Sequence, residues 1–110
     1  MTSPFERLAA VDPLVHAPAR LAILTALGAC KEADFTYLRR ITGLTQGNLG
    51  SHLTKLEDGG LVAITKSFVG RTPRTSVALT DDGQAAIRAW WDAIAETRSD
   101  ADAWEPDGER

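Results

Sequence analysis

The chain has 110 residues, of which 44% are hydrophobic and 25% are charged. This length allows one ordinary domain with a modest core and excludes a catalytic domain joined to a separate sensor domain. The composition is that of a soluble globular protein, and no stretch approaches the roughly 20 apolar residues that a membrane span needs. A net charge of −3 argues at first sight against a nucleic-acid partner.

The start of the chain and its cysteine content indicate a compartment. Residues 1–7 lack the basic start and the long apolar stretch of a signal peptide. Cys30 is the single cysteine, so no disulfide can form within the chain. We therefore expect a cytoplasmic, reducing location. Cys30 is interpreted as a small buried residue and not as a redox switch, because it has no resolving partner in the chain.

Charge is distributed unevenly along the sequence. Residues 1–35 carry a net charge of −1, residues 36–80 carry +4 and residues 81–110 carry −6. In the basic middle segment only Glu57 and Asp58 oppose the Lys and Arg residues. Such asymmetry is typical of a surface that binds a polyanion, while ordinary solvated charge is the simpler alternative.

Two helices are predicted in the first third of the chain. A short helix follows Pro4 and ends before Pro13, because the residue before a proline disfavours helical angles. A second helix begins at Pro18 and runs to Gly28, and it is apolar nearly all round, as expected for the buried centre of a small domain. Residues 31–34 are expected to form a polar break.

The next two helices are separated by a very short turn. Thr36 is expected to cap a helix that directs Leu38 and Ile41 inward and ends at Gly43. Thr45 is expected to cap the following helix. The inward residues of that helix are Leu49, Leu53 and Leu56, at positions i, i+4 and i+7. The helix is expected to end at Gly59 and Gly60. Two helices joined in this way predict a helix-turn-helix.

From residue 61 the apolar period changes from helical to alternating. A strand from Val62, a turn over residues 70–73 and a strand over residues 76–79 predict a β-hairpin with a basic tip. Thr80 is then expected to cap a last helix that ends near Arg98. The predicted fold class is mainly α with a small β-hairpin wing, with residues 1–98 as the domain and residues 99–110 as an acidic, disordered tail.

The outward face of the helix after Thr45 predicts DNA contact. Opposite its leucines the face is small, polar and free of acid, whereas ordinary surface helices favour Glu, Lys and Ala. Short donors and acceptors there can reach base edges in a major groove, and glycines let the backbone approach closely. The candidates for base contact lie in the N-terminal half of the helix: Gln46, Gly47, Asn48 and Ser51.

Candidates for contacts to the DNA backbone or the minor groove surround this helix. Arg71 and Arg74 flank Pro73 at the hairpin tip, from which they can reach past the helix. His52 lies at the border of the buried leucine stripe. Two interpretations of its side chain therefore stay open: packing against the core, or contact with a DNA phosphate. The full set of these candidates is Thr36, Arg39, Arg40, Thr45, His52, Lys55, Lys66, Arg71 and Arg74.

The order and spacing of four segments resemble the winged helix-turn-helix regulators of the ArsR and MarR type. The segments are residues 20–24 (RLAIL), 51–62 (SHLTKLEDGGLV), 66–75 (KSFVGRTPRT) and 79–83 (LTDDG). The resemblance spans about residues 14–97. It implies a dimeric transcription factor that binds operator DNA, and the lack of an activation module favours a repressor.

The metal sites of some members of that group have no counterpart in this chain. Metal-sensing members carry Cys-x-Cys at the start of the third helix, or His and carboxylate ligands in the last helix. The corresponding residues are 34–37 (DFTY) and 92–96 (DAIAE). With one cysteine and no histidine after His52, we expect no metal site and no cofactor.

The last helix has a stripe of bulky apolar side chains that must be buried from water. Each Trp offers about 200 Å² for burial, and a helix of about 17 residues spans about 25 Å, more than a core of this size can cover. We expect a twofold dimer through the terminal helices. Its interface residues are Phe5, Leu8, Ile87, Trp90, Trp91 and Ile94. An alternative use of the tryptophans is to line a site for a small aromatic effector at this interface.

The sequence therefore predicts a homodimeric, sequence-specific transcriptional regulator of double-stranded DNA. Residues 45–58 are expected in the major groove and residues 62–79 at the minor groove or the backbone. The alternative is a winged-helix protein-interaction module without a DNA function. No membrane partner and no enzymatic activity are expected: Ser51 and His52 are neighbours on a helix, about 100° apart, and do not face each other as nucleophile and base.

Overall fold

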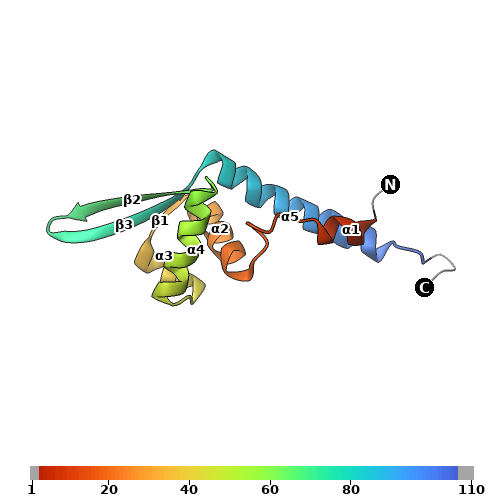
Figure 1. The fold of residues 1–110 in the computed structure, drawn as a ribbon, viewed down its shortest axis with the longest axis horizontal. Coiled ribbons are helices and arrows are strands. Elements are labelled where there is room, and N and C mark those ends of the chain that lie inside the picture. The colour runs from red at the N-terminus through yellow and green to blue at the C-terminus, as the bar shows by residue number, and fades with distance from the viewer. Residues whose placement is uncertain (1–2, 107–110) are drawn as a thin grey trace.

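A computed structural model describes residues 3–106 as helices around a small sheet (Figure 1). The elements in chain order are α1 (Pro4–Ala9), α2 (Pro18–Cys30), β1 (Glu32–Asp34), α3 (Phe35–Thr42), α4 (Gln46–Asp58), β2 (Val62–Val69), β3 (Thr72–Leu79) and α5 (Asp81–Asp102). The strands form one antiparallel sheet in the order β1-β3-β2. The predicted class, helices with a β wing, is confirmed.

Helix α2 lies at the centre of the core and contacts α3, α4 and α5. Its side chains Ile23, Leu24 and Leu27 are fully buried, as expected for a helix that is apolar nearly all round. The rest of the core comprises Val15, Ala33, Leu38, Leu49, Leu53, Leu56, Leu61, Val62, Val77 and Ile87. Burial of each large aliphatic side chain stabilises the fold by about 1.5–3 kcal/mol, so this cluster fixes how α4 and the wing are presented.

The sheet has one strand more than the predicted hairpin. Strand β1 pairs with the end of β3, where Ala33 lies opposite Val77 and is buried. Residues 31–34 were expected to be a polar break, which is wrong. A strand of three residues with acidic side chains at both ends shows no apolar alternation, and its pairing partner is distant in the sequence.

The wing is a longer hairpin than expected. Strands β2 and β3 are joined by Gly70 and Arg71 alone, whereas the predicted turn covered residues 70–73. Gly70 has a φ of 64°, in the left-handed region that favours glycine at such a two-residue turn. Pro73 lies within β3, where it is tolerated because the pairing of β1 with β3 reaches only Ser76, so the missing N–H of Pro73 costs no bond to β1.

Helix α3 differs from its prediction at two positions. Its cap is Asp34, whose Oδ1 accepts a hydrogen bond from the Tyr37 backbone N–H at 2.7 Å, and the expected cap Thr36 lies inside the helix. Ile41 was expected to face inward with Leu38, but it is 45% exposed. Residues three apart are offset by about 60° around a helix, so Ile41 lies beside Leu38 but at the edge of the narrow contact that this short helix makes with the core.

Helix α5 begins after its predicted cap, Thr80, whose Oγ1 accepts a hydrogen bond from the Gly83 backbone N–H at 2.9 Å. It runs to Asp102, four residues beyond the predicted end at Arg98. Part of the predicted tail is therefore helical, and residues 107–110 of that tail lie outside the described residues. The division of the chain into a domain and a tail stays a prediction.

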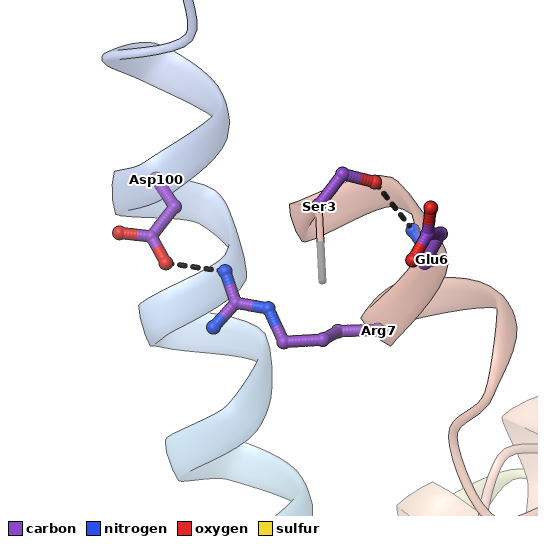
Figure 2. A network of polar contacts seen from close by, with 4 residues as sticks. All are labelled: Ser3, Glu6, Arg7 and Asp100. Carbon is purple, nitrogen blue, oxygen red and sulfur yellow. Dashed lines mark hydrogen bonds and ion pairs between the residues drawn. The ribbon is translucent and has the colours of Figure 1, made fainter. Parts of the chain in front are cut away.

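Helix α1 packs along the distal part of α5, which explains the extra helical turn (Figure 1). Figure 2 shows Ser3 capping α1 and Arg7 Nη2 reaching across to Asp100 Oδ2 in an ion pair. Beyond it, the rings of Phe5 and Trp104 form a T-shaped pair with centroids 5.2 Å apart. These contacts stabilise an acidic segment that is a weak helix former by sequence alone.

The chain as described is long and narrow, with principal extents of 68 × 25 × 21 Å. Its radius of gyration is 17.3 Å, whereas a compact domain of this length has about 13 Å. The wing projects from one end and the paired helices α1 and α5 from the other (Figure 1). A shape of this kind leaves apolar surface on the projecting helices exposed to water.

Cys30 was expected to be buried, and this is wrong because its side chain is exposed. It is the last residue of α2, where the chain turns away from the core. The turn is made by Lys31, which has a φ of 68°. The apolar character of α2 predicted burial, but the helix ends at the surface.

Candidate nucleic-acid interface

Helices α3 and α4 meet at a tight turn of three residues. Helix α3 ends at Gly43, whose φ of 71° makes it a left-handed C-cap. Thr45 caps α4 as predicted: its Oγ1 accepts a hydrogen bond from the Asn48 backbone N–H at 3.1 Å. Leu44, between the two caps, packs against the core. The turn therefore holds α4 in one orientation against α3, as in a helix-turn-helix.

Helix α4 has one buried face and one exposed face, as its sequence predicts. The leucines Leu49, Leu53 and Leu56 are buried against the core. The candidates for base contact lie exposed on the other side of the helix: Gln46, Gly47, Asn48 and Ser51. The exposed N-terminal half of α4 is thus a row of short polar groups without acidic side chains, which suits contact with base edges.

Two glycines leave open space on the surface of α4. A Cβ atom added at Gly47 or Gly50 would meet no atom within 4 Å. Alanine stabilises a helix relative to glycine by up to about 1 kcal/mol, so the fold itself gives no reason for glycine at either position. The open space allows another molecule to approach the helix backbone closely.

The Lys and Arg candidates for phosphate contact all lie at the surface. The exposed candidates are Thr36, Arg39, Arg40, Thr45, Lys55, Lys66, Arg71 and Arg74. Within residues 3–106, no basic member of this set forms an ion pair. The guanidinium of Arg40 lies over the Tyr37 ring, 5.2 Å from its centroid, which holds that charge at the surface of α3. These cations are free to pair with an external anion.

Surface grooves bring several of the candidates together. One groove, of 670 Å³, lies between α4 and the wing, and Gln46 and Lys66 both line it. A second groove, of 410 Å³, is lined by Thr36 at the start of α3 and by Arg74 of β3. A third, of 320 Å³, is lined in part by Thr36, Arg39 and Arg40. Helices α3 and α4 and the wing therefore form one continuous polar and basic surface, called the basic face below.

Among the polar residues that line the groove between α4 and the wing, Thr54 and Thr75 were not in the predicted contact set. Helical spacing does place Thr54 on the outward face of α4, three residues after Ser51, but Thr54 was not included among the contact candidates. Thr75 carries no such signal. It reaches the groove because it lies opposite Lys66 in the hairpin, and that register is set by the whole sheet.

Hydrogen bonds at the base of the wing fix its orientation relative to α4. Glu57 Oε2 accepts a hydrogen bond from the Ile64 backbone N–H at 3.3 Å, which joins the end of α4 to β2. The Thr80 backbone N–H donates to Leu61 O at 3.1 Å, and its hydroxyl donates to Gly60 O at 2.6 Å. The base of the hairpin is thus tied on both sides, so the wing keeps its position beside α4.

His52 lies at the edge of the basic face and is half-buried. Burial lowers the pKa of its imidazole, and the neighbouring cations Arg20 and Lys55 lower it further. Its Nδ1 is buried and has no hydrogen-bond partner in the part of the chain that the structure describes. His52 therefore favours the neutral form at neutral pH and adds no positive charge to the basic face. A role at phosphate stays a prediction.

The residues predicted for a dimer interface divide into two groups. Ile87 is only 6% exposed and belongs to the core, so it offers little surface to a second chain. Trp90 and Ile94 are partly buried within the chain. By contrast, about half of each side chain is exposed for Phe5, Leu8 and Trp91. The exposed part of the predicted stripe is therefore confined to α1 and one side of α5.

The side chains of Trp90 and Trp91 are held in place by contacts within the chain. Trp90 Nε1 donates a hydrogen bond to His16 Nδ1, and Trp91 Nε1 donates to Thr25 Oγ1, each at 3.2 Å. The two rings pack edge to face, with centroids 4.8 Å apart. Next to Trp90, a shallow apolar groove of 220 Å³ runs along α5 and includes Ala89 and Val11. A preformed apolar surface therefore lies far from the basic face.

Residues 3–106 contain neither a metal-binding cluster nor a membrane-spanning helix. No cluster of three or more His, Cys, Asp or Glu side chains there has an arrangement that could hold a metal ion. No helix in that range combines the length and the apolar character needed to cross a membrane. The acidic segment after residue 80 forms α5, which extends away from the wing (Figure 1). The basic face is thus separated from most of the negative charge.

A helix-turn-helix with a polar exposed helix, followed by a basic β wing, defines the class of winged-helix DNA-binding regulators. The sequence matches the family described as winged helix DNA-binding domain over residues 19–97. The chain belongs to this family. The resemblance to winged helix-turn-helix regulators, stated from the sequence, is confirmed, and the protein is a DNA-binding transcriptional regulator.

Known proteins are similar to this chain in sequence and in structure. An uncharacterised protein of Methanocaldococcus jannaschii is 36% identical over 69 residues, which are 63% of this chain and 75% of that protein. A transcriptional regulator homologue from Pyrococcus horikoshii is 31% identical with a TM-score of 0.80, over 86% of this chain and 95% of that one. The transcriptional repressor CouR, bound to a 23-mer DNA duplex, is 27% identical with a TM-score of 0.71, over 86% and 66% of the two chains.

Proposed function

We propose that the protein binds operator DNA as a homodimer and represses transcription in the cytoplasm, without enzymatic activity. The N-terminal half of α4 enters the major groove, where Gln46, Gly47, Asn48 and Ser51 face base edges. The wing lies along the adjacent minor groove or backbone. The phosphate contacts come from Thr36, Arg39, Arg40, Thr45, Lys55, Lys66, Arg71 and Arg74.

One observation carries this proposal: the exposed face of α4 is polar, free of acid in its N-terminal half and open above two glycines. A helix whose surface serves only solubility gains stability from alanine or glutamate at such positions. The basic residues around α4 form no ion pairs within residues 3–106, so their charge is available to phosphates. The similar repressor CouR, which was solved on a DNA duplex, supports both the partner and the repressor role.

Asn48→Ala and Ser51→Ala are expected to change base preference. Each removes a polar group that faces a base edge, and a good side-chain pair with a base is worth about 1–3 kcal/mol of discrimination. We expect preference at one position of each half-site to fall by about 10-fold, with the salt dependence unchanged because no charge is lost. The measurement is selection of bound duplexes from a random pool, followed by titration of the selected sequence at several salt concentrations.

Ser99→Ala is the matched control, because it removes the same hydroxyl from an exposed position on α5, away from the basic face. It should select the same sequence as the unaltered protein. If Asn48→Ala and Ser51→Ala also select that sequence with unaltered affinity, the base contacts are wrong. If the unaltered protein enriches no sequence at all, specific operator binding itself is wrong.

Twofold symmetry is proposed from the shape and the apolar surface of the chain. Helix α5 has 22 residues, about 33 Å of helix, and the short helix α1 packs along its distal part (Figure 1). Exposed Phe5, Leu8 and Trp91 lie on these two helices. A second copy of this chain would bury these apolar side chains on both protomers in one interface. The same twofold arrangement would place the two α4 helices on successive turns of a palindromic operator.

Ala89→Glu is expected to weaken the dimer. Ala89 is exposed on α5 and lines the apolar groove beside Trp90, so a carboxylate there would be desolvated at an interface but harmless in a monomer. Sedimentation at micromolar concentration should show dimers for the unaltered protein and monomers for this variant. Ala22→Glu adds the same group at an exposed position of α2 and should stay dimeric. A monomeric unaltered protein would disprove the dimer.

The small aromatic effector at the dimer interface stays a prediction. The groove beside Trp90 is apolar and lies next to the proposed interface, which is the kind of lining such a ligand needs. The rival function, a winged helix that contacts only proteins, predicts the opposite result in the selection experiment. It would be favoured if no duplex is enriched while affinity capture returns one stoichiometric protein partner.

A further inference from the structure

The wing carries an aromatic side chain that the fold leaves in water. Phe68 is 72% exposed, more than any other large apolar side chain in the described residues, and its neighbour Val69 is 61% exposed. Both lie next to the turn formed by Gly70 and Arg71. No aromatic ring pair involves Phe68 in residues 3–106. Phe68 contributes little buried apolar area to the core. An exposed side chain of this size and position indicates contact with a molecule outside the chain.

Strand alternation places Phe68 on the side of the wing that faces α4. Successive side chains of a strand point to opposite faces, so Phe68 shares a face with Ile64 and Lys66, which line the groove beside α4. Pro73 lies directly opposite Phe68 in the hairpin and extends the apolar tip. Val69 alternates to the other side of the strand and lines the groove that also includes Thr36 and Arg74. Phe68 therefore belongs to the basic face, beyond the residues that were predicted for it.

The charge around Phe68 is entirely positive within the wing. Residues 62–79 contain Lys66, Arg71 and Arg74 and no Asp or Glu. An apolar ring surrounded by cations suits a partner that combines dense negative charge with an apolar interior. Duplex DNA has both, since phosphates line each groove and the stacked bases lie between them. The tip is also slim: it is a two-residue turn that includes Gly70, and a minor groove is about 6 Å wide.

We propose that Phe68, backed by Pro73, acts as an apolar wedge that enters the minor groove and partly unstacks one base step. Arg71 and Arg74 hold the phosphates on either side of this step. The inference deepens the proposed function, on which it rests, by assigning an uncharged wing residue to the DNA contact. An inserted side chain of this kind kinks the duplex, and flexible pyrimidine–purine steps then become preferred at positions that α4 does not touch.

Phe68→Ala tests the wedge, with Thr65→Ala as the control, because Thr65 is exposed on the other face of the same strand and lines none of the grooves of the basic face. The probe is the duplex that the unaltered protein selects from a random pool, with 2-aminopurine in place of single adenines. We expect Phe68→Ala to weaken binding by about 10-fold, with an unchanged salt slope, because no charge is removed. The unaltered protein should raise 2-aminopurine fluorescence at one step per half-site, and Phe68→Ala should abolish that rise.

Thr65→Ala should keep the affinity within about twofold and keep the fluorescence rise. Phe68→Leu retains an apolar wedge and should keep most of both effects. Circular dichroism and a thermal melt of each variant show whether it is folded. If Phe68→Ala is misfolded, Phe68→Leu is compared with Phe68→Tyr, because the tyrosine hydroxyl opposes insertion between bases. Weaker DNA binding and a smaller fluorescence rise for Phe68→Tyr support the wedge. Equal affinity and an equal fluorescence rise for the two variants overturn it.

Three further results would overturn the wedge. If Phe68→Ala is folded and matches the unaltered protein in affinity and fluorescence on the selected duplex, the wedge is wrong and the DNA-binding function stands. If the unaltered protein binds no duplex, both are wrong. If it binds phosphatidylglycerol vesicles more tightly than the selected duplex, and Phe68→Ala abolishes vesicle binding alone, the tip is a membrane contact instead.

Discussion

Gly83→Ala is expected to lower the free energy of unfolding by about 3 kcal/mol. A Cβ at Gly83 would lie 1.9 Å from Leu61 O and 2.9 Å from Leu61 C. These are backbone atoms, so no side-chain rotation can relieve the overlap. The first turn of α5 rests directly on the backbone at the base of the wing, and only glycine allows that approach.

The displacement would also break hydrogen bonds that orient the wing. Leu61 O accepts the bond from the Thr80 backbone N–H, and Gly60 O accepts the bond from the Thr80 hydroxyl. Urea denaturation followed by circular dichroism measures the loss. Gly28→Ala is the control, because a Cβ at that helical position of α2 meets no atom within 4 Å, and its stability should stay equal or rise by up to about 1 kcal/mol. Equal midpoints for the two variants would show that α5 does not rest on Leu61.

The parts of the fold that sequence could predict depend on neighbours in the sequence. The buried face of α4 follows from leucines at helical spacing, and its start follows from the side chain of Thr45. The start of α5 follows in the same way from Thr80. Each of these features is set within one or two helical turns, so the order of residues contains all the information required.

The parts that could not be predicted depend on residues far apart in the sequence. Strand β1 exists because Ala33 packs opposite Val77, which no local pattern shows. With β1 in place, Asp34 becomes the last strand residue and the cap of α3. The far end of α5 is helical because α1 packs against it. In each case a tertiary contact overrides a weak local preference.

The residues of the candidate site likewise divide into those that local sequence predicts and those that depend on distant contacts. A helical wheel places Gln46, Asn48 and Ser51 on the exposed face of α4, and they are exposed. For the stripe on α5, the same periodicity cannot distinguish a residue that contacts the chain's own core from one that remains exposed. Ile87 is buried and Trp91 is half exposed, because α5 packs against the core with only part of the stripe.

Removing both arginines of the wing is expected to weaken DNA binding by about 100-fold or more at physiological salt. Arg71 and Arg74 are two of the six cations of the basic middle segment, and in a dimer the double change removes four. Each cation that pairs with a phosphate releases a counterion and adds about 0.9 to the slope of log K against log salt. The slope should therefore become shallower by about 3.6 in the variant that carries Arg71→Ala with Arg74→Ala.

The two arginines contact phosphates in this proposal, so the loss should be nearly equal on the selected duplex and on an unrelated duplex. Arg88→Ala, an exposed arginine on α5 away from the wing, should leave both affinities and the slope unchanged. Fluorescence anisotropy at four or more salt concentrations gives all these quantities. A loss confined to the selected duplex would instead assign the arginines to bases. An unchanged slope with unchanged affinity would mean that the wing does not touch DNA, and the basic face would then consist of α3 and α4 alone.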